Sequence, residues 1–200
     1  MVKKPARAGT LVIVTGVPGV GKTTVLTSTI DICKERGINV KRINYGDVML
    51  EAAMANRLVR DRDEMRRLPV KEQISLQLTA AKKIRSVAEK SNVILDTHMF
   101  IRTPYGYMPG IPSWVAESLL PDSVVLLEAD PELISKRRRK DIEIRTREED
   151  ELSRISEHQL MGKGGATAIS VLTGCTVLVV NNRESGHMVA GAVIADLFKR

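Results

Sequence analysis

TGVPGVGKTTV, residues 15–25, is the stretch that decides the fold of this chain. It places three glycines and a proline between a short apolar run, Leu11–Val14, and a lysine followed by two threonines. A stretch so poor in side chains contributes little to a packed core. Glycine, which has no Cβ, lets successive backbone N–H groups curl around a bound anion. The stretch therefore predicts a loop whose main chain binds a ligand.

The spacing of these residues matches the phosphate-loop pattern G-x-x-x-x-G-K-[ST] from Gly16 to Thr23. In such a loop the backbone N–H groups and the start of the next helix bind phosphates. Lys22 reaches the β- and γ-phosphates, and the Thr23 hydroxyl helps to hold Mg²⁺. A tight strand-to-helix turn is the alternative, but a buried strand before the motif and a helix after it favour nucleoside triphosphate binding. The expected ATP-binding residues are Gly16, Val17, Pro18, Gly19, Val20, Gly21, Lys22, Thr23 and Thr24.

Short β-branched runs alternate with helix-length segments along the chain. This alternation predicts an α/β fold in which a single domain, residues 1–200, holds a five-stranded parallel sheet with helices on both faces. Ligands in such sheets bind beyond the carboxyl ends of the strands. The expected strands are 10–15, 39–44, 92–96, 123–129 and 175–181, and the expected helices are 23–36, 47–57, 63–67, 70–90, 112–119, 131–140, 148–172 and 186–199.

The charged residues give a formal net charge of +7 and gather in patches. Seven basic and two acidic residues lie between Lys136 and Arg147, and a second basic cluster runs from Arg57 to Lys71. Such an excess indicates an anionic partner without separating a nucleotide from a nucleic acid or a membrane surface. Only 3% of the residues are aromatic, so stacking on RNA bases has little support. We expect no nucleic-acid partner.

The two cysteines, Cys33 and Cys175, lack the spacing of a metal site or a disulfide framework. Two buried thiols in a reducing compartment are the simplest interpretation. The apolar run Leu11–Val14 is too short for a membrane span or a signal peptide. We therefore expect a cytoplasmic protein without a membrane partner.

Asp96 ends the third expected strand, after the apolar residues 93–95. A carboxylate at that place can hold Mg²⁺, directly or through water, together with the Thr23 hydroxyl. The alternative is that Asp96 caps a helix or a turn. Thr23 and Asp96 are thus the predicted metal-binding residues, and Mg²⁺, bound with ATP, is the predicted cofactor.

Five further segments follow one another over nearly the whole chain: NYGDVM at 44–49, DEMRRL at 63–68, DTHMFIRTPYGYMPGIP at 96–112, the arginine-rich segment 136–147 and ISEHQ at 155–159. Together with the phosphate loop they resemble the archaeal-type adenylate kinases, a branch of the nucleoside monophosphate kinases in the P-loop NTPase superfamily. The resemblance implies reversible phosphoryl transfer, ATP + AMP = 2 ADP, with Mg²⁺. It also implies a homotrimer.

The resemblance also implies where the acceptor nucleotide binds. Residues 46–90, which are too long for a simple crossover, would form a helical insertion for AMP. Arg102 would bind the AMP α-phosphate, since a guanidinium is a rigid and permanently charged fork. Leu50 stands where bacterial-type relatives have an arginine, so Arg66 or Arg67 is the expected substitute, with a solvated charged face as the alternative. The expected AMP-binding residues are Asp47, Arg66, Arg67, His98 and Arg102, although His98 could instead fill the cleft.

By the same resemblance, residues 138–148 form a short lid within the domain. Arg138 or Arg139 would stack on the ATP adenine, which adds Arg138 to the ATP-binding residues. Arg145 and Arg147 would fold over the transferring phosphoryl group and exclude water. A solvated helix end, whose cations favour the C-terminal dipole, is the alternative for the first arginines. The expected catalytic residues are Lys22, Arg102, Arg139, Arg145 and Arg147.

Two other functions stay open at this point. A kinase for another small acceptor, such as a different nucleotide, a nucleoside or shikimate, would share the phosphate loop. A nucleotide-switched RNA-binding or assembly factor would explain the basic clusters. Two local features also have alternatives. Tyr105, Tyr107 and Trp114 are expected in a loop rich in proline and glycine, where they either pack against an adenine or support the cleft wall. Met161–Gly165 either kinks a helix or packs it closely.

Overall fold

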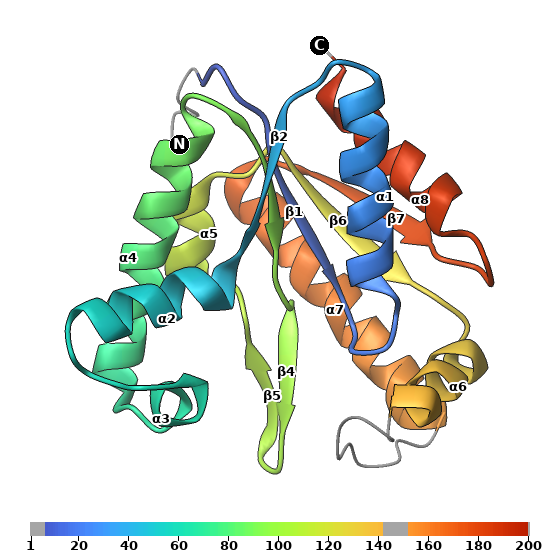
Figure 1. The fold of residues 1–200 in the computed structure, drawn as a ribbon. Coiled ribbons are helices and arrows are strands. Elements are labelled where there is room, and N and C mark those ends of the chain that lie inside the picture. The colour runs from blue at the N-terminus through green and yellow to red at the C-terminus, as the bar shows by residue number, and fades with distance from the viewer. Residues whose placement is uncertain (1–6, 142–151, 200) are drawn as a thin grey trace.

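The structure of the chain is a computed structural model that describes residues 7–141 and 152–199. The main strands are β1 (Leu11–Gly16), β2 (Val40–Asn44), β3 (Asn92–Asp96), β6 (Ser123–Glu128) and β7 (Thr176–Asn181). They form one parallel sheet with the strand order β2-β3-β1-β6-β7 (Figure 1). The expected fold class is therefore confirmed.

The helices of the described residues are α1 (Lys22–Glu35), α2 (Tyr45–Ala55), α3 (Arg62–Arg66), α4 (Val70–Ala88), α5 (Ser113–Leu119), α6 (Pro131–Asp141), α7 (Leu152–Thr173) and α8 (His187–Ala195), followed by a 3-10 turn, Asp196–Phe198. α1 and α8 lie on one face of the sheet, and α4, α5 and α7 lie on the other. The middle strand β1 is consequently buried along its whole length. A strand that is covered on both faces is apolar without alternation, as in LVIV of β1.

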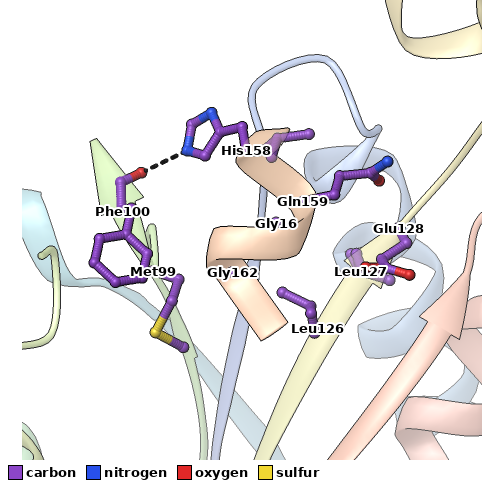
Figure 2. Close-up of a pocket in the computed structure, with 10 residues that line it drawn as sticks. Gly16, Met99, Phe100, Leu126, Leu127, Glu128, His158, Gln159 and Gly162 are labelled. Atoms are coloured by element: carbon purple, nitrogen blue, oxygen red, sulfur yellow. Dashed lines mark hydrogen bonds between the residues drawn. The ribbon is translucent and has the colours of Figure 1, made fainter. Parts of the chain in front are cut away.

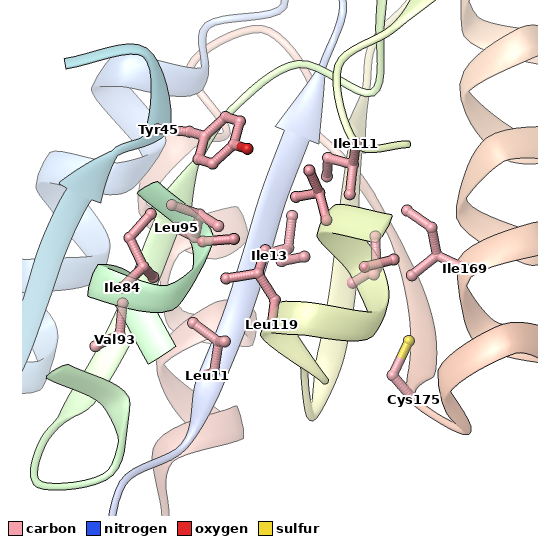
Figure 3. Close-up of a cluster of buried hydrophobic side chains, with 14 of the residues drawn as sticks. Leu11, Ile13, Tyr45, Ile84, Val93, Leu95, Ile111, Leu119, Ile169 and Cys175 are labelled. Atoms are coloured by element: carbon pink, nitrogen blue, oxygen red, sulfur yellow. The ribbon is translucent and has the colours of Figure 1, made fainter. Parts of the chain in front are cut away.

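The core consists of two apolar layers, because successive residues of a strand point to opposite faces of the sheet. Leu11 and Ile13 of β1 pack with Leu95 and Leu119 in the layer beneath α4 and α5 (Figure 3). Val12 packs in the other layer, beneath α1 and α8. Among the described residues, no helix combines the length and the apolar character that crossing a membrane would require.

Between β2 and β3 the chain forms α2, α3 and α4 instead of a single crossover helix. These helices pack around a small apolar cluster of Ala53, Val59 and Leu76 that is separate from the two main layers. Figure 1 shows α2 and α3 grouped at the lower end of α4, while the rest of α4 covers the sheet beside α5. An insertion over residues 46–90 fits this arrangement, and its role in nucleotide binding stays a prediction.

The stretch 96–112, expected as a loop rich in proline and glycine, instead contains an antiparallel hairpin of β4 (Phe100–Thr103) and β5 (Gly106–Pro109). The prolines do not disrupt it, because Pro104 lies in the turn and Pro109 ends a strand of a two-stranded sheet. Gly106 supplies the positive φ, 117°, that the turn needs. The loop expectation was wrong because turn residues mark the ends of short strands as well as true loops.

The glycines at 162–165 lie inside α7, which runs unbroken through them. A Cβ at Gly165 would come within 2.6 Å of the Phe100 ring, and one at Gly162 would be 3.3 Å from a Leu126 methyl group. α7 therefore approaches the hairpin and β6 closely, which confirms close packing rather than a kink. A Cβ at Gly164 would meet no atom within 4 Å, and nothing in the structure explains that glycine.

Candidate active site

The phosphate-loop motif forms the turn between β1 and α1, at the carboxyl edge of the sheet. Gly19 and Gly21 have φ values of 85° and 88°, in the left-handed region that favours glycine. The Val20 N–H donates to the Val17 carbonyl over 3.2 Å and tightens the turn. α1 begins at Lys22 with neither a side-chain cap nor an acidic residue in its first turn. The positive end of the α1 dipole therefore faces the loop without a side-chain anion to satisfy it.

Lys22 and Asp96 meet beside this loop. The Lys22 ammonium donates to the Asp96 carboxylate and, over 2.7 Å, to the Thr97 carbonyl. Arg42 of β2 donates to the second carboxylate oxygen of Asp96, also over 2.7 Å. Burial raises the pKa of Asp96, but the two cations outweigh burial and hold that pKa below its usual value. Burial also lowers the pKa of Lys22, against the opposing effect of Asp96.

Arg42 was not among the residues expected at the site. It stands two positions before the end of an edge strand, where a charged residue is ordinarily solvated. The sequence pattern therefore did not indicate that Arg42 belongs to the site. The parallel register, which sets Asn44 opposite Asp96, brings the Arg42 side chain within reach of the carboxylate. Sequence spacing alone does not reveal that register.

The residues predicted for Mg²⁺ fit that ion in chemistry. Thr23 is exposed at the start of α1, and Asp96 supplies a buried carboxylate that already attracts two cations. Both offer oxygen atoms, the ligands that Mg²⁺ prefers. Within residues 7–141 and 152–199, no three His, Cys, Asp or Glu side chains gather into a metal site. A Mg²⁺ ion at this place would therefore need phosphate oxygens and water as its remaining ligands.

The hairpin of β4 and β5 carries Arg102, which is exposed on it. Phe100 and Tyr107 meet edge to face at 6.3 Å, and the Tyr107 ring lies 5.0 Å from that of His158. The His158 ring also contacts the Phe100 carbonyl at 3.1 Å (Figure 2). A cavity of about 10 Å³, the size of one water molecule, lies between this contact and Gly16. The hairpin is thus fixed against α7, and Arg102 lies on a braced element.

His98 lies between Asp96 and the hairpin. Burial, and next the positive charge of Lys22, lower the pKa of His98 to about 4. A hydrogen bond to the main chain of Gly16 acts in the opposite direction and is too weak to restore it. The ring is therefore neutral near pH 7 and contacts the start of the phosphate loop. Its expected contact with AMP stays a prediction.

Comparison with known proteins agrees with this geometry. A family model described as an AAA domain matches residues 15–156. An adenylate kinase from Methanopyrus kandleri is 47% identical over 88% of this chain and 91% of its own length. An adenylate kinase from Methanocaldococcus jannaschii is 45% identical over 87% of this chain and 90% of its own length. The chain belongs to the adenylate kinase family.

Membership of the adenylate kinase family confirms the sequence resemblance and makes the protein a phosphotransferase. A solved structure, the shikimate kinase of Acinetobacter baumannii in complex with shikimate, superposes with a TM-score of 0.57 over 96% of this chain and 93% of its own. Because the two sequences are only 12% identical, the superposition shows a shared fold and nothing about the acceptor.

The residues that the adenylate kinase resemblance assigned to AMP lie on several elements. Asp47 stands in the first turn of α2, where the Asn44 side chain accepts a hydrogen bond from the Asp47 N–H, and Arg62 pairs with its carboxylate. Arg66 and Arg67 are exposed at the end of α3. Figure 1 shows α3 at the outer end of the helical group. The described structure does not bring these two arginines to the phosphate loop.

Two arginines of α6 bind the phosphate loop of this adenylate kinase from outside. Arg138 donates from Nε to the Pro18 carbonyl over 2.8 Å, and only 7% of Arg138 is exposed. Arg137 donates to the Val20 carbonyl over 2.9 Å, and Asn182 donates to the same carbonyl over 2.8 Å. The sequence gave no signal for Arg137 or Asn182 at the loop, because their partners are main-chain atoms far away in the chain. The predicted stacking of Arg138 on adenine stays a prediction.

The remaining predicted lid residues lie at or beyond the end of α6, where the described residues stop at Asp141. Arg145 and Arg147 lie outside the described residues, and so does the side chain of Arg139. The expected lid, 138–148, is therefore described only as far as Asp141, the last residue of α6.

A cleft of about 610 Å³ opens beyond the carboxyl ends of β6 and β7. It lies between α6 and the segment that follows β7, and its polar lining includes Asp130, Glu132, Lys136, Asn181 and Arg183. This volume is within the range of small-molecule sites.

The three aromatic residues near the hairpin have different surroundings. Tyr105 is fully exposed in the turn, and Tyr107 packs on Phe100. The Trp114 indole donates to the Gln77 side chain over 3.0 Å. Tyr107 thus supports a wall beside the site, as one of the two alternatives has it.

Proposed function

We propose that this adenylate kinase transfers the γ-phosphoryl group of Mg²⁺-bound ATP to AMP and so forms two ADP molecules. The observation that carries the proposal is the phosphate loop with Lys22 and Thr23, opposite Asp96, in a chain 47% identical to a curated adenylate kinase. Phosphoryl transfer needs positioning and positive charge more than covalent chemistry. The loop and Lys22 would supply both at one edge of the sheet, and Asp96 would hold the Mg²⁺ there.

On the ATP side, the N–H groups of the loop and the start of α1 bind the phosphates. Lys22 exchanges Asp96 and the Thr97 carbonyl for the β- and γ-phosphates, because its ammonium already lies beside the loop. Thr23 and Asp96 hold Mg²⁺, which neutralises phosphate charge when bound. The cleft between α6 and the segment after β7 is the proposed place of the adenine.

On the acceptor side, Arg102 binds the α-phosphate of AMP. The support for this assignment is its position on the braced hairpin, six residues after Asp96. The insertion 46–90, with Asp47 and Arg66 or Arg67, encloses the nucleoside part, and His98 lines the space between the two nucleotides as a neutral ring.

The segment 138–148 is proposed as the lid. Arg139, Arg145 and Arg147 would then bring positive charge to the transferring group and shield it from water, since an open site would favour hydrolysis. Their closure over the substrates would explain why a net charge of +7 is concentrated in patches.

We also propose a homotrimer in the cytoplasm. Leu160 and Val171 are exposed on α7, as are Val177 and Val179 on the edge strand β7, and such an apolar surface favours association with further copies. Both cysteines are free buried thiols, as expected in a reducing compartment. Light scattering that gave the mass of one chain at micromolar concentration would contradict the trimer.

The reaction is tested by incubating the purified protein with ATP, Mg²⁺ and one acceptor at a time: AMP, CMP, UMP or shikimate. ADP should form rapidly with AMP alone, and Lys22→Met should lower the rate by at least about 100-fold, because one electrostatic contact to the transition state is lost. An unchanged circular dichroism spectrum would show that the variant is folded. Fast turnover with another acceptor but not with AMP would refute the proposal.

A further inference from the structure

Two peptide groups of the phosphate loop are held through their carbonyl oxygens by side chains from elsewhere in the chain. The Pro18 carbonyl accepts from Arg138, and the Val20 carbonyl accepts from both Arg137 and Asn182. These donors come from α6 and from the residue that follows β7. The loop is therefore tied to two elements that lie more than 100 residues later in the chain.

Each of the two carbonyls belongs to a peptide whose other half is a glycine N–H, that of Gly19 or Gly21. In a trans peptide the C=O and N–H bonds point in opposite directions, and the described residues contain no cis peptide. A carbonyl that is held toward α6 and Asn182 consequently directs the following N–H away from them. A reversed peptide would present a carbonyl oxygen to a bound anion and repel it.

Glycine makes such a reversal easy, because it adopts positive and negative φ with similar ease. Gly19 and Gly21 both have positive φ in this structure. The same permissive residues that form the loop would thus leave it with several conformations, and ordering them on binding would cost free energy. An external restraint removes that cost before the ligand arrives.

The glycines also make room for the donors. A Cβ at residue 19 would lie 2.7 Å from Arg138 Cγ, and a Cβ at residue 21 would lie 2.6 Å from the Asn182 amide nitrogen. Gly19 occupies a free position of the phosphate-loop pattern, which does not itself require glycine there. Its close approach to Arg138, together with its positive φ, accounts for it.

We propose that Arg137, Arg138 and Asn182 are positioning residues that hold the Pro18–Gly19 and Val20–Gly21 peptides in the orientation that binds polyphosphate. They act through the main chain of the loop and need not touch the nucleotide. The inference rests on the proposed function in one respect only, namely that the loop binds phosphate groups.

Two substitutions at Arg138 separate this role from a contact with adenine or a contribution of charge. In Arg138→Gln the side-chain amide nitrogen stands at the same number of bonds from Cα as the arginine Nε, so the donor is kept and the charge is lost. In Arg138→Met a methyl group stands there, so both are lost. The probe is inorganic triphosphate, which has no base, and its binding is measured by calorimetry.

Arg138→Met should bind inorganic triphosphate about fivefold more weakly than Arg138→Gln, the loss expected for one hydrogen bond from a neutral donor. Arg138→Gln should bind inorganic triphosphate with an affinity between those of the wild-type protein and Arg138→Met, because it keeps the hydrogen bond to the Pro18 carbonyl but loses the charge that strengthens that bond. Equal affinities in the two variants would overturn the proposal, because charge or stacking would then explain all of the loss.

A second readout follows the loop itself. Protein labelled with ¹⁵N-glycine contains 14 glycines, few enough for each amide to be followed by nuclear magnetic resonance. Arg138→Met should increase the picosecond-to-nanosecond mobility of the Gly19 amide, while Asn182→Leu should affect mainly Gly21. Unchanged amides in both variants would refute the positioning role, whatever the affinities.

Asn182→Leu also covers the case in which Arg138→Met does not fold. The Asn182 amide oxygen is buried without a hydrogen-bond partner in the described part of the chain, so leucine removes an unsatisfied atom along with the donor. Triphosphate affinity should fall only about threefold, because Arg137 still holds the Val20 carbonyl. No change in affinity or in Gly21 mobility would contradict the inference.

The outcome is distinguishable from failure of the proposed function. A wild-type protein that binds triphosphate but forms no ADP from AMP would refute the reaction and leave the positioning role intact. Rapid ADP formation with indistinguishable Gln and Met variants would do the reverse.

Discussion

Adjacent glycines in α7 should respond to alanine with opposite signs. Gly164→Ala adds a methyl group where no atom lies within 4 Å, so only helix propensity acts. Alanine is better than glycine inside a helix by about 1 kcal/mol, and the free energy of unfolding should rise by about that amount. Gly165→Ala gains the same propensity but brings its Cβ within 2.6 Å of the Phe100 ring and 2.8 Å of Met99 Cγ.

Overpacking a closely packed contact costs about 1–3 kcal/mol. Taking about 2 kcal/mol for that cost and subtracting about 1 kcal/mol for propensity, Gly165→Ala should lose about 1 kcal/mol. The two variants should therefore differ by about 2 kcal/mol, or roughly 4–8 °C in melting temperature for a chain of this size. The clash falls on the hairpin that carries Arg102, so Gly165→Ala should also raise the Michaelis constant for AMP.

The assay is urea unfolding followed by circular dichroism, without nucleotide and at two protein concentrations, so that association between chains is detected. Equal m-values would show that both variants unfold from the same compact state. Equal stabilisation of both variants would refute the reasoning, since α7 would then have room at residue 165 and the close packing would not constrain the hairpin.

Three further predictions concern single side chains. Arg102→Lys should raise the Michaelis constant for AMP more than that for ATP in steady-state kinetics, because lysine cannot replace a bidentate guanidinium; the reverse order would assign Arg102 to the other nucleotide. Tyr45→Phe should reduce the decrease in the free energy of unfolding at alkaline pH, as measured by urea titrations. Burial raises the pKa of Tyr45, so the unfolded state loses its proton first and wild-type stability falls as pH rises above about 10; curves that stay parallel up to pH 11 would contradict this. Arg7→Ala should lower the free energy of unfolding by about 3–5 kcal/mol in the same assay, because the nearly buried Arg7 side chain binds two carbonyls and a carboxylate. Lys83→Ala, which breaks an exposed ion pair, should lower it by less than about 1 kcal/mol. Equal losses in the two variants would count against the burial argument.

Much of the site was predictable because its decisive signal is contiguous. The phosphate loop, its strand and its helix occupy residues 11–35 without interruption, and the conformation they need follows from local sterics and dipoles. Asp96 was predictable for a related reason, since the carboxyl ends of parallel strands meet at one edge of a sheet. Its two counterions were only half predictable: Lys22 lies in the motif, but Arg42 depends on the register between β2 and β3.

Sequence patterns did not predict the hairpin, because its turn residues resemble those of a loop and its stability depends on long-range contacts. The hairpin of β4 and β5 was taken for a loop because its four-residue strands are bounded by proline and glycine. Its stability depends on Tyr107, His158 and the close approach of α7 at Gly165, which no local pattern reveals. The glycines of α7 gave a signal for close packing but not for its partner.

The sequence by itself determined the sheet, its flanking helices and the main-chain loop for phosphate, because alternation, glycine spacing and helix starts act over a few residues. Only the tertiary structure decided which side chains hold that loop and its carboxylate: Arg42, Arg137, Arg138 and Asn182. Their partners are a carboxylate and main-chain carbonyls 54 to 162 residues away. A main-chain carbonyl is present at every residue, so no sequence pattern can mark the one that a distant donor selects, and packing makes that choice.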